Sequence, residues 1–179
     1  STLQSLGIDV IDLGLTTTPT VEIAVKMEKA FGGIILTASH NPKQWNALKL
    51  LNEKGEFISA NDGNEILRIA EEENFEYAHI DDLGVVVEKN YLQKHISAIL
   101  ALSSVDIDSV KSSKFKVVVD AVNSSGGIYL PALLEAMGVE VVKLNCDPTG
   151  EFSHNPEPLP EYLHDLCSLV VASNADLGF

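Results

Sequence analysis

Residues 116–144, KVVVDAVNSSGGIYLPALLEAMGVEVVKL, are the stretch that decides the fold class. The segments 116–120 and 139–144 are short and mostly apolar, which is typical of buried strands. Between them, serine and glycine at 124–127 predict a turn, and 129–137 has the length and composition of a helix. A strand, a helix and a second strand in this order predict a right-handed crossover between parallel strands, and therefore an α/β fold.

The same alternation continues on both sides of this stretch. Upstream, Thr18-Pro19 predicts the start of a helix that Gly32-Gly33 ends, and Asp62 predicts the cap of another helix. Gly55 lies in a turn between two apolar runs within 48–58, which predicts a β-hairpin. Further strands are predicted at 10–13, 34–36 and 85–87, further helices at 91–102 and 161–171, and a last strand leads toward Phe179.

An internal similarity bears on the number of units. Residues 3–13, LQSLGIDVIDL, align without gaps on 134–144, LEAMGVEVVKL, with leucine, glycine, valine and leucine identical at four positions. The similarity is either a genuine repeat or a chance likeness between equivalent elements. A genuine repeat predicts that a strand before residue 1 and a loop after residue 179 are missing from this chain.

The polar, serine-rich segment 103–114 predicts a linker. We therefore expect one unit at 1–104 and another at 105–179. The expected architecture is α/β, with two similar three-layer α/β/α units on mixed, mostly parallel sheets, both truncated at an end.

Composition limits the classes of partner. Of 179 residues, 45% are hydrophobic, which is enough for a packed core. Twelve basic against 26 acidic residues give a net charge of −14, which repels phosphate backbones and argues against a nucleic-acid partner. No apolar run could span a membrane and the first residues do not resemble a signal peptide, so we expect a cytoplasmic protein without a membrane partner. Cys146 and Cys167 form no CxxC pair, and the oligomeric state stays open.

Residues 37–42, TASHNP, directly follow a predicted apolar strand. Ligands of α/β proteins bind at the carboxyl ends of strands, so this loop is the leading candidate for a site. From Thr37 to Lys49 there are two lysines and no carboxylate, which favours an anion-binding pocket. The alternative is that Ser39 and Asn41 only satisfy the backbone of a turn.

Other interpretations of the serines and histidines are weaker. Residues 153–156 repeat SHNP, but they lie in a proline-rich loop and are interpreted as structural. Ser39 lacks the GxSxG elbow of a hydrolase, and the adjacent His40 cannot easily turn onto it as a base. There is no P-loop motif, and the remaining histidines show no metal-ligand spacing.

Residues 33–42, GIILTASHNP, followed by NALK at 46–49, resemble the phosphoserine loop of the α-D-phosphohexomutase superfamily, the phosphoglucomutases and phosphomannomutases. Ala47 is a departure, because many members have glycine there, but it leaves Lys49 in place. Other segments are also similar to the superfamily, so that the likeness runs nearly end to end: Thr18-Pro19, DPTGEFSHNPEPLPE at 147–161 and ADLG at 175–178.

The resemblance implies four domains, of which this chain holds most of the first and most of the second. It implies that Ser39 is a phosphoserine that exchanges its phosphoryl group with the sugar and gives one oxygen to Mg²⁺. The other metal ligands are expected in an Asp-rich loop beyond Phe179. Lys49 is then the proton-transfer group, and His40 orients and screens the phosphate. The phosphate loop is completed by Thr37, Asn41 and Lys43.

The activity that the resemblance implies is that of an isomerase, an intramolecular phosphotransferase. It interconverts hexose 1-phosphate and hexose 6-phosphate, of glucose or mannose or both, through a hexose 1,6-bisphosphate. The expected partners are hexose phosphates and the missing domains of the same chain, and the fragment alone is expected to be inactive. Glucosamine phosphate is not excluded as the substrate. The alternative is a non-catalytic module that binds sugar phosphates on the same loop without carrying phosphate on Ser39.

Overall fold

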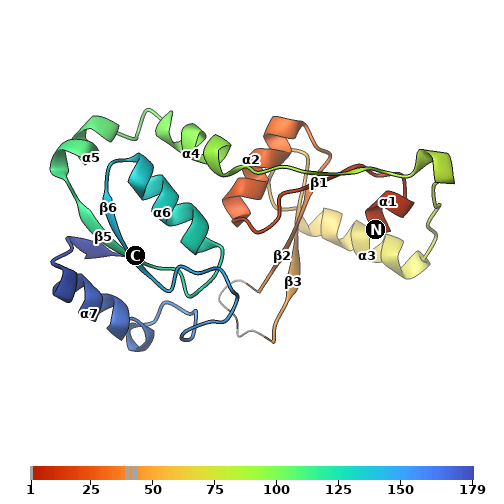
Figure 1. Cartoon of the computed structure of the whole chain (residues 1–179). Coiled ribbons are helices and arrows are strands. Elements are labelled where there is room, and N and C mark those ends of the chain that lie inside the picture. Colours follow the sequence, from red (N-terminus) through yellow and green to blue (C-terminus); the bar gives the residue numbers. More distant parts are fainter. Residues whose placement is uncertain (1, 39–40, 42–43) are drawn as a thin grey trace.

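The computed structural model describes residues 2–38, 41 and 44–179, which form two α/β units connected through the helix α4 (Figure 1). The first unit contains α1 (Thr2–Ser5), β1 (Val10–Asp12), α2 (Thr18–Glu28), β2 (Gly33–Thr37), β3 (Ala47–Leu51), α3 (Ala60–Glu72), the 3-10 helix η1 (Ile80–Asp82) and β4 (Val86–Glu88). After α4 (Leu92–Leu100), the second contains α5 (Ile107–Ser113), β5 (Lys116–Asp120), α6 (Gly126–Ala136), β6 (Glu140–Leu144), the 3-10 helix η2 (Pro160–Tyr162), α7 (His164–Ser173) and β7 (Leu177–Gly178). None of the helices in this described part is long and apolar enough to cross a bilayer.

The second unit has three layers, with a parallel sheet between two helices. Its strands lie in the order β6-β5-β7. Val117 and Val119 of β5 pack against side chains of α6. Val118 faces the opposite side, where its neighbour in the sheet, Gly178, lies against α7. Because Val118 and Val119 are fully buried, β5 is the centre of this core. The α/β class with mostly parallel strands, expected from residues 116–144, is confirmed.

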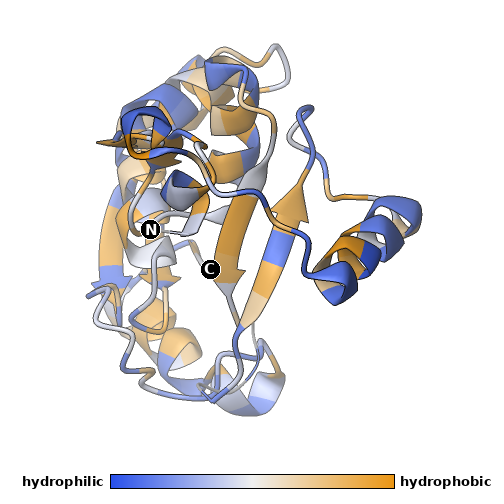
Figure 2. Ribbon diagram, turned by 90° about the vertical axis from the view of Figure 1, so that its right-hand side faces the viewer, coloured by the Kyte–Doolittle hydropathy of each residue, from blue (hydrophilic) through white to orange (hydrophobic). Residues whose placement is uncertain are grey.

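The strands of the first unit form two pairs. β1 and β4 are parallel, whereas β2 and β3 lie side by side as an antiparallel, mostly apolar pair (Figure 2). The helix α2 covers one face of the β2–β3 pair, where Val21 and Val25 pack with Ile35 and Leu51. Since side chains alternate along a strand, the residues between them point to the other face. Apolar side chains remain exposed there: Ile34, Leu36 and Leu48.

The internal similarity extends to the backbone. Gly7 and Gly138 both adopt positive φ, 74° and 80°. In each copy the glycine N–H donates to the carbonyl three residues earlier, at 2.9 and 3.0 Å, and the next N–H donates to the carbonyl five residues earlier, at 3.0 Å in both. This pair of bonds is the Schellman motif that ends a helix. The likeness of 3–13 to 134–144 therefore corresponds to the same helix end, glycine and strand, and supports a genuine repeat.

Two predicted helix boundaries are corrected. α2 ends at Glu28 instead of Gly32-Gly33, because Lys29 already adopts the left-handed conformation, with φ of 53°. Ser59, not Asp62, is the N-cap of α3. Asp62 lies three residues further on, and its carboxylate accepts the Ser59 N–H at 3.0 Å, while the Ser59 hydroxyl accepts the Asp62 N–H at 3.2 Å. The two residues thus form a capping box.

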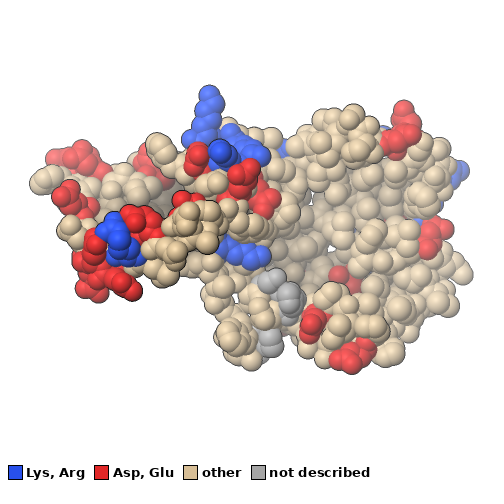
Figure 3. Space-filling model, turned by 180° about the vertical axis from the view of Figure 1, so that it is seen from behind, with Lys and Arg blue, Asp and Glu red and all other residues tan. Residues whose placement is uncertain are grey.

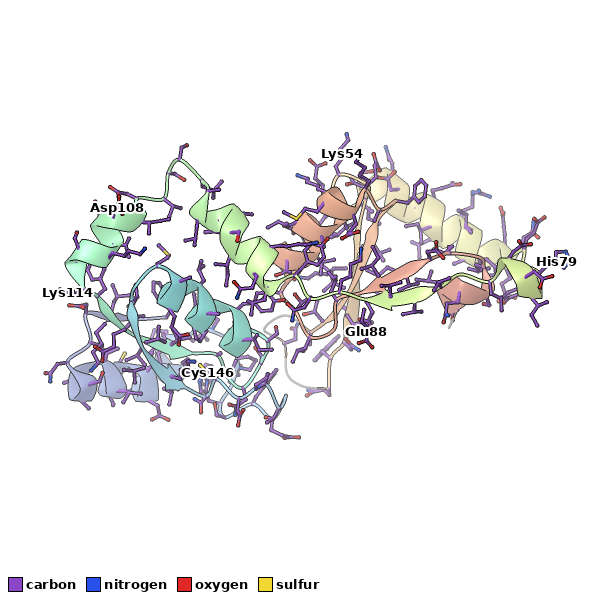
Figure 4. All side chains as sticks on the ribbon, turned by 45° about the horizontal axis from the view of Figure 1, so that its top comes forward. Lys54, His79, Glu88, Asp108, Lys114 and Cys146 are labelled. Atoms are coloured by element: carbon purple, nitrogen blue, oxygen red, sulfur yellow. The ribbon has the colours of Figure 1, made fainter. Side chains whose placement is uncertain are left out.

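The predicted hairpin and linker are also corrected. The turn with Gly55 forms, at φ of 71°, but β3 pairs with β2, and the segment after the turn makes a single bridge, Leu51 to Phe57. The segment 103–114 contains α5, which starts where the Asp106 side chain accepts the Ser109 N–H at 3.0 Å. The labelled residues Asp108 and Lys114 mark this helix in Figure 4.

Gly127, at the start of α6, leaves no room for a side chain. A Cβ there would lie 2.3 Å from the carbonyl oxygen of Cys146 and 2.7 Å from its carbonyl carbon. These atoms are backbone, so side-chain rotation cannot relieve the clash. We expect Gly127→Ala to lower the free energy of unfolding by about 2–4 kcal/mol, measured by urea denaturation.

The matched control is Gly63→Ala, in the exposed helix α3. A Cβ at Gly63 meets only Ile58 Cδ1, at 4.0 Å. Alanine favours a helix more than glycine does, so this variant should gain up to about 1 kcal/mol. Equal effects of the two substitutions would contradict the close approach of α6 to the end of β6.

Candidate functional site

The loop 38–46 joins β2 to β3 at one end of their antiparallel pair. Thr37, the last residue of β2, lies opposite Ala47, the first residue of β3. Within the loop, the backbone N–H and the side-chain amide of Asn41 both donate to the carbonyl of Ala38, at 3.1 and 3.0 Å. These bonds close a turn at the root of the loop. They fit the loop-holding role expected of Asn41, which stays a prediction.

The residues predicted for the site are described in part. Ser39, His40 and Lys43 lie outside the described residues, so their predicted roles rest on the sequence. Thr37 and Lys49 are on the two strands that carry the loop. Ala47, the departure from the superfamily pattern, is part of β3 and keeps its place in the register.

Lys49 lies on the face of β3 that it shares with Thr37. It is opposite Ile35, and Thr37 is two residues further along β2, so the two predicted side chains are diagonal neighbours. Lys49 is half-buried, and its Nζ lies 5.7 Å from the centre of the Phe57 ring. This is a cation–π distance, which holds the ammonium without cancelling its charge. The register thus places a cationic side chain in the middle of β3, two residues after Ala47, where the loop ends.

The acidic side chains of the chain are unevenly placed. Figure 3 shows a dense group of them at the end of the molecule that carries α3 and η1, with others scattered over the second unit. In α3, Arg68 pairs with Glu65 at 2.6 Å and also with Glu72. By contrast, the stretch from Thr37 to Lys49 contains no carboxylate. The net charge of −14 is therefore compatible with an anion-binding loop between β2 and β3.

A metal site is not formed by the described residues alone. No group of three or more His, Cys, Asp and Glu side chains among them is arranged to hold an ion. Mg²⁺ prefers several oxygen ligands in near-octahedral geometry, and the described residues around β2 and β3 do not supply them. The described residues therefore do not fit Mg²⁺, and we derive no chemical step through the metal.

A second polar cluster, which the sequence did not predict, lies at the carboxyl end of β5. The side chain of Asp120 is only 5% exposed. One of its carboxylate oxygens accepts the Val122 N–H at 3.0 Å and the Asn145 amide at 3.2 Å, and the other lies 3.0 Å from His154 Nε2. The His154 contact holds the proline-rich loop to the end of β5, and the structural interpretation of residues 153–156 stays a prediction.

Both ring nitrogens of His154 face acceptors. Nε2 meets the Asp120 carboxylate, and Nδ1 lies 2.8 Å from the carbonyl oxygen of Asn155. Only the doubly protonated ring can donate in both directions. Burial alone would lower the pKa of His154, but the hydrogen bonds to Asp120 and Asn155 and the Asp120 charge outweigh it and raise the pKa. The repeated SHNP motif is the one sequence signal that points to this residue.

The charged form of His154 should make stability depend on pH. Because its pKa is raised above the ordinary value of 6.5, its stabilising contribution is complete below pH 6.5 and is lost as pH rises through the raised pKa. We expect the difference in thermal unfolding midpoint between wild type and His154→Gln to shrink from pH 5.5 to pH 8.5.

The exposed His79, at the far tip of the first unit in Figure 4, is the matched control. His79→Gln removes an exposed imidazole and measures what the substitution itself does at each pH. A difference between wild type and His154→Gln that does not change with pH would show that the His154–Asp120 pair is not ionic.

Comparisons with known proteins cover nearly the whole chain. Residues 1–77 match the family model "Phosphoglucomutase/phosphomannomutase, alpha/beta/alpha domain I", and residues 93–179 match the model of domain II. A protein of Methanopyrus kandleri named "Probable phosphoglucosamine mutase" is 38% identical over 99% of this chain. A protein of Thermococcus kodakarensis named "Phosphoglucomutase/phosphomannomutase" is 36% identical, again over 99% of the chain.

The solved structures agree with these matches. A crystal structure of a phosphoglucomutase/phosphomannomutase family protein from Burkholderia thailandensis superposes with a TM-score of 0.80, at 26% identity, over 99% of this chain and 38% of that one. The chain spans 38% and 39% of the length of the Methanopyrus and Thermococcus relatives.

Proposed function

This chain belongs to the phosphoglucomutase/phosphomannomutase family, and on that premise we propose that the whole protein is a mutase that carries its phosphoryl group on Ser39. The observation that carries the proposal is the loop between β2 and β3. It holds TASHNP, lacks carboxylates, is closed by Asn41 onto Ala38, and has Lys49 on the adjoining strand.

The proposed step is the transfer of a phosphoryl group between Ser39 and a sugar hydroxyl. The hydroxyl oxygen bonds to phosphorus as the bond from phosphorus to Ser39 Oγ breaks. The proton of the sugar hydroxyl ends on Ser39 Oγ, and Lys49 moves it. The resulting hexose 1,6-bisphosphate reorients while bound to the enzyme, and its other phosphate returns to Ser39 by the reverse step.

The remaining residues of the loop would position and neutralise the phosphate. His40 and Lys43 supply positive charge, since a phosphoserine carries roughly −1.5 to −2 charges. Thr37 and Asn41 would fix the end of the loop that follows β2. The described residues offer no set of carboxylates that could bind Mg²⁺. The proposal that the whole protein uses Mg²⁺ therefore rests on the family resemblance alone.

The substrate class is a hexose phosphate. The relatives are named for glucosamine phosphate in one case and for glucose and mannose phosphates in the other. We therefore propose all three sugars as candidates, to be separated by assay of the whole protein. Because the chain spans 38% of the first relative, we propose that these 179 residues alone are inactive.

The test is whether Ser39 carries phosphate. The whole protein is purified from cells and its intact mass compared with that of a phosphatase-treated sample, and the phosphate is then mapped by peptide sequencing. Phosphate on Ser39 that transfers to glucose 1-phosphate supports the mutase. Binding of sugar phosphates by a protein that never carries phosphate on Ser39 would favour the non-catalytic module, and turnover by the isolated 179 residues would contradict the inactive fragment.

A further inference from the structure

Four side chains meet where the first unit, α4 and the second unit come together: Thr16, Thr20, His95 and Tyr129, which we call the junction cluster. Thr16 Oγ1 donates to the Tyr129 hydroxyl at 2.7 Å, across 113 residues of sequence. Thr20 Oγ1 lies 2.8 Å from His95 Nδ1. The rings of His95 and Tyr129 lie 6.3 Å apart between centres, at an angle of 49°. The cluster therefore joins the loop after β1, the start of α2, the middle of α4 and α6.

The junction cluster is an interior feature. Thr20 is completely buried, and the other three members are half-buried. The Thr17 hydroxyl lies 2.7 Å from the Thr20 hydroxyl and extends the network. A buried hydroxyl that loses its partner keeps its desolvation cost, so these bonds favour one arrangement of the units over others.

The segment that leads into α4, and the first turn of α4 itself, are also held to the end of α2. Glu28, at the end of α2, pairs with Lys89 at 2.6 Å and with Lys94 at 3.7 Å, and it accepts a hydrogen bond from Tyr91. Tyr91 is completely buried, and Lys94 Nζ lies 4.3 Å from the centre of its ring. The helix α4 therefore contacts both α2 and α6 and places His95 between them, as Figure 1 shows for the order α2, α4, α6.

Packing connects the junction cluster to the loop between β2 and β3. Thr20 is followed on α2 by Val21 and Val25, and both pack against Ile35 of β2. β2 ends at Thr37, where the loop begins. Because the interior of the first unit is closely packed, a rotation at the cluster would move the loop relative to the second unit.

We propose that the junction cluster is a positioning site, which fixes the angle between the two units and so holds the loop that carries Ser39 in place against the second unit. This inference rests on the proposed mutase function. Transfer in line requires the reacting groups to be aligned closely, and a misplacement of about 1 Å can cost about 100-fold in rate. None of the four side chains is assigned a chemical role in the transfer.

The first experiment measures the angle between the units directly. Spin labels are placed on cysteines introduced at the exposed positions Lys54 and Asp108, one in each unit (Figure 4), in a Cys146→Ala, Cys167→Ser background. Pulsed electron resonance of the chain then gives the distribution of distances. We expect one narrow distribution, which broadens or shifts in Thr16→Val and in Tyr129→Phe.

Conservative and distant variants are the controls. Thr16→Ser keeps the hydroxyl and should restore the narrow distribution. Tyr77→Phe removes a hydroxyl from a tyrosine that is 68% exposed and should change nothing. Tyr129→Phe is expected to lower the unfolding midpoint by only about 2–4 °C, so the measurement is made on folded protein.

The second experiment measures turnover by the whole protein. Thr16→Val and Tyr129→Phe should lower kcat by about 10- to 100-fold, with the KM for hexose phosphate and the fraction of phosphorylated Ser39 little changed. Thr16→Ser should recover kcat. Unchanged distance distributions in both variants would contradict the claim that the junction cluster fixes the angle between the units. Changed distances with an unchanged kcat would contradict its role in positioning the loop for catalysis. Absence of mutase activity in the wild type would instead refute the proposed function. The distance measurement would then still decide whether the junction cluster fixes the angle between the units.

Discussion

Ser39→Ala in the whole protein should abolish mutase activity, with kcat falling by about 10⁴-fold or more. Alanine has no oxygen to accept or release the phosphoryl group, so neither half of the proposed exchange can take place. Binding of the sugar phosphate should persist, because the other groups of the loop remain. The measurement is a coupled assay of hexose 6-phosphate formation, accompanied by intact-mass analysis, which should find the phosphorylated species missing.

The chain supplies a matched control for this variant. Ser153 is the first residue of the second SHNP segment, and it is exposed in the proline-rich loop held by His154 and Asp120. Ser153→Ala should keep full activity and phosphate content. Equal losses in both variants, or full activity of Ser39→Ala, would refute the assignment of Ser39.

The main strands could be predicted because each is a short apolar run with turn residues beside it. Residues 116–120 and 34–36 are examples, and both form strands as expected, although the second strand extends to Gly33–Thr37. Helix ends were less predictable, because Lys29 adopts a left-handed conformation that is usually left to glycine. The hairpin prediction was wrong about the pairing. β3 pairs along its whole length with β2, whereas the segment after the Gly55 turn makes a single bridge to β3.

Among the polar features of the chain, only those that lie within one continuous segment could be predicted from the sequence. The loop at 37–42 could be predicted because motif, position and charge lie in one continuous segment. The junction cluster and the Asp120–His154 pair could not, since their partners are far apart in sequence: 113 residues for Thr16 and Tyr129, and 34 for Asp120 and His154. Single polar residues in helices and loops carry no pattern, and only the fold brings them together.

Lys49→Met should lower kcat by about 10²- to 10⁴-fold, the usual contribution of a positioned proton-transfer group. Methionine is one atom shorter than lysine but keeps much of its volume, and β3 is already bound to β2 through its backbone, so the unfolding midpoint should change little. Lys54→Met, at the exposed turn after β3, is the control for loss of one positive charge and should keep its activity.

Two further variants distinguish proton transfer by Lys49 from the effect of its positive charge. Lys49→Arg keeps the charge over the Phe57 ring but cannot release a proton at neutral pH, so it should be nearly as impaired as Lys49→Met if the lysine transfers a proton. Lys49→Ala should regain activity when small primary amines are added, because they can enter the space left by the side chain and carry the proton. A fully active Lys49→Arg, with no rescue of Lys49→Ala by amines, would mean that Lys49 acts by its charge alone, and proton transfer would have to be assigned to another group.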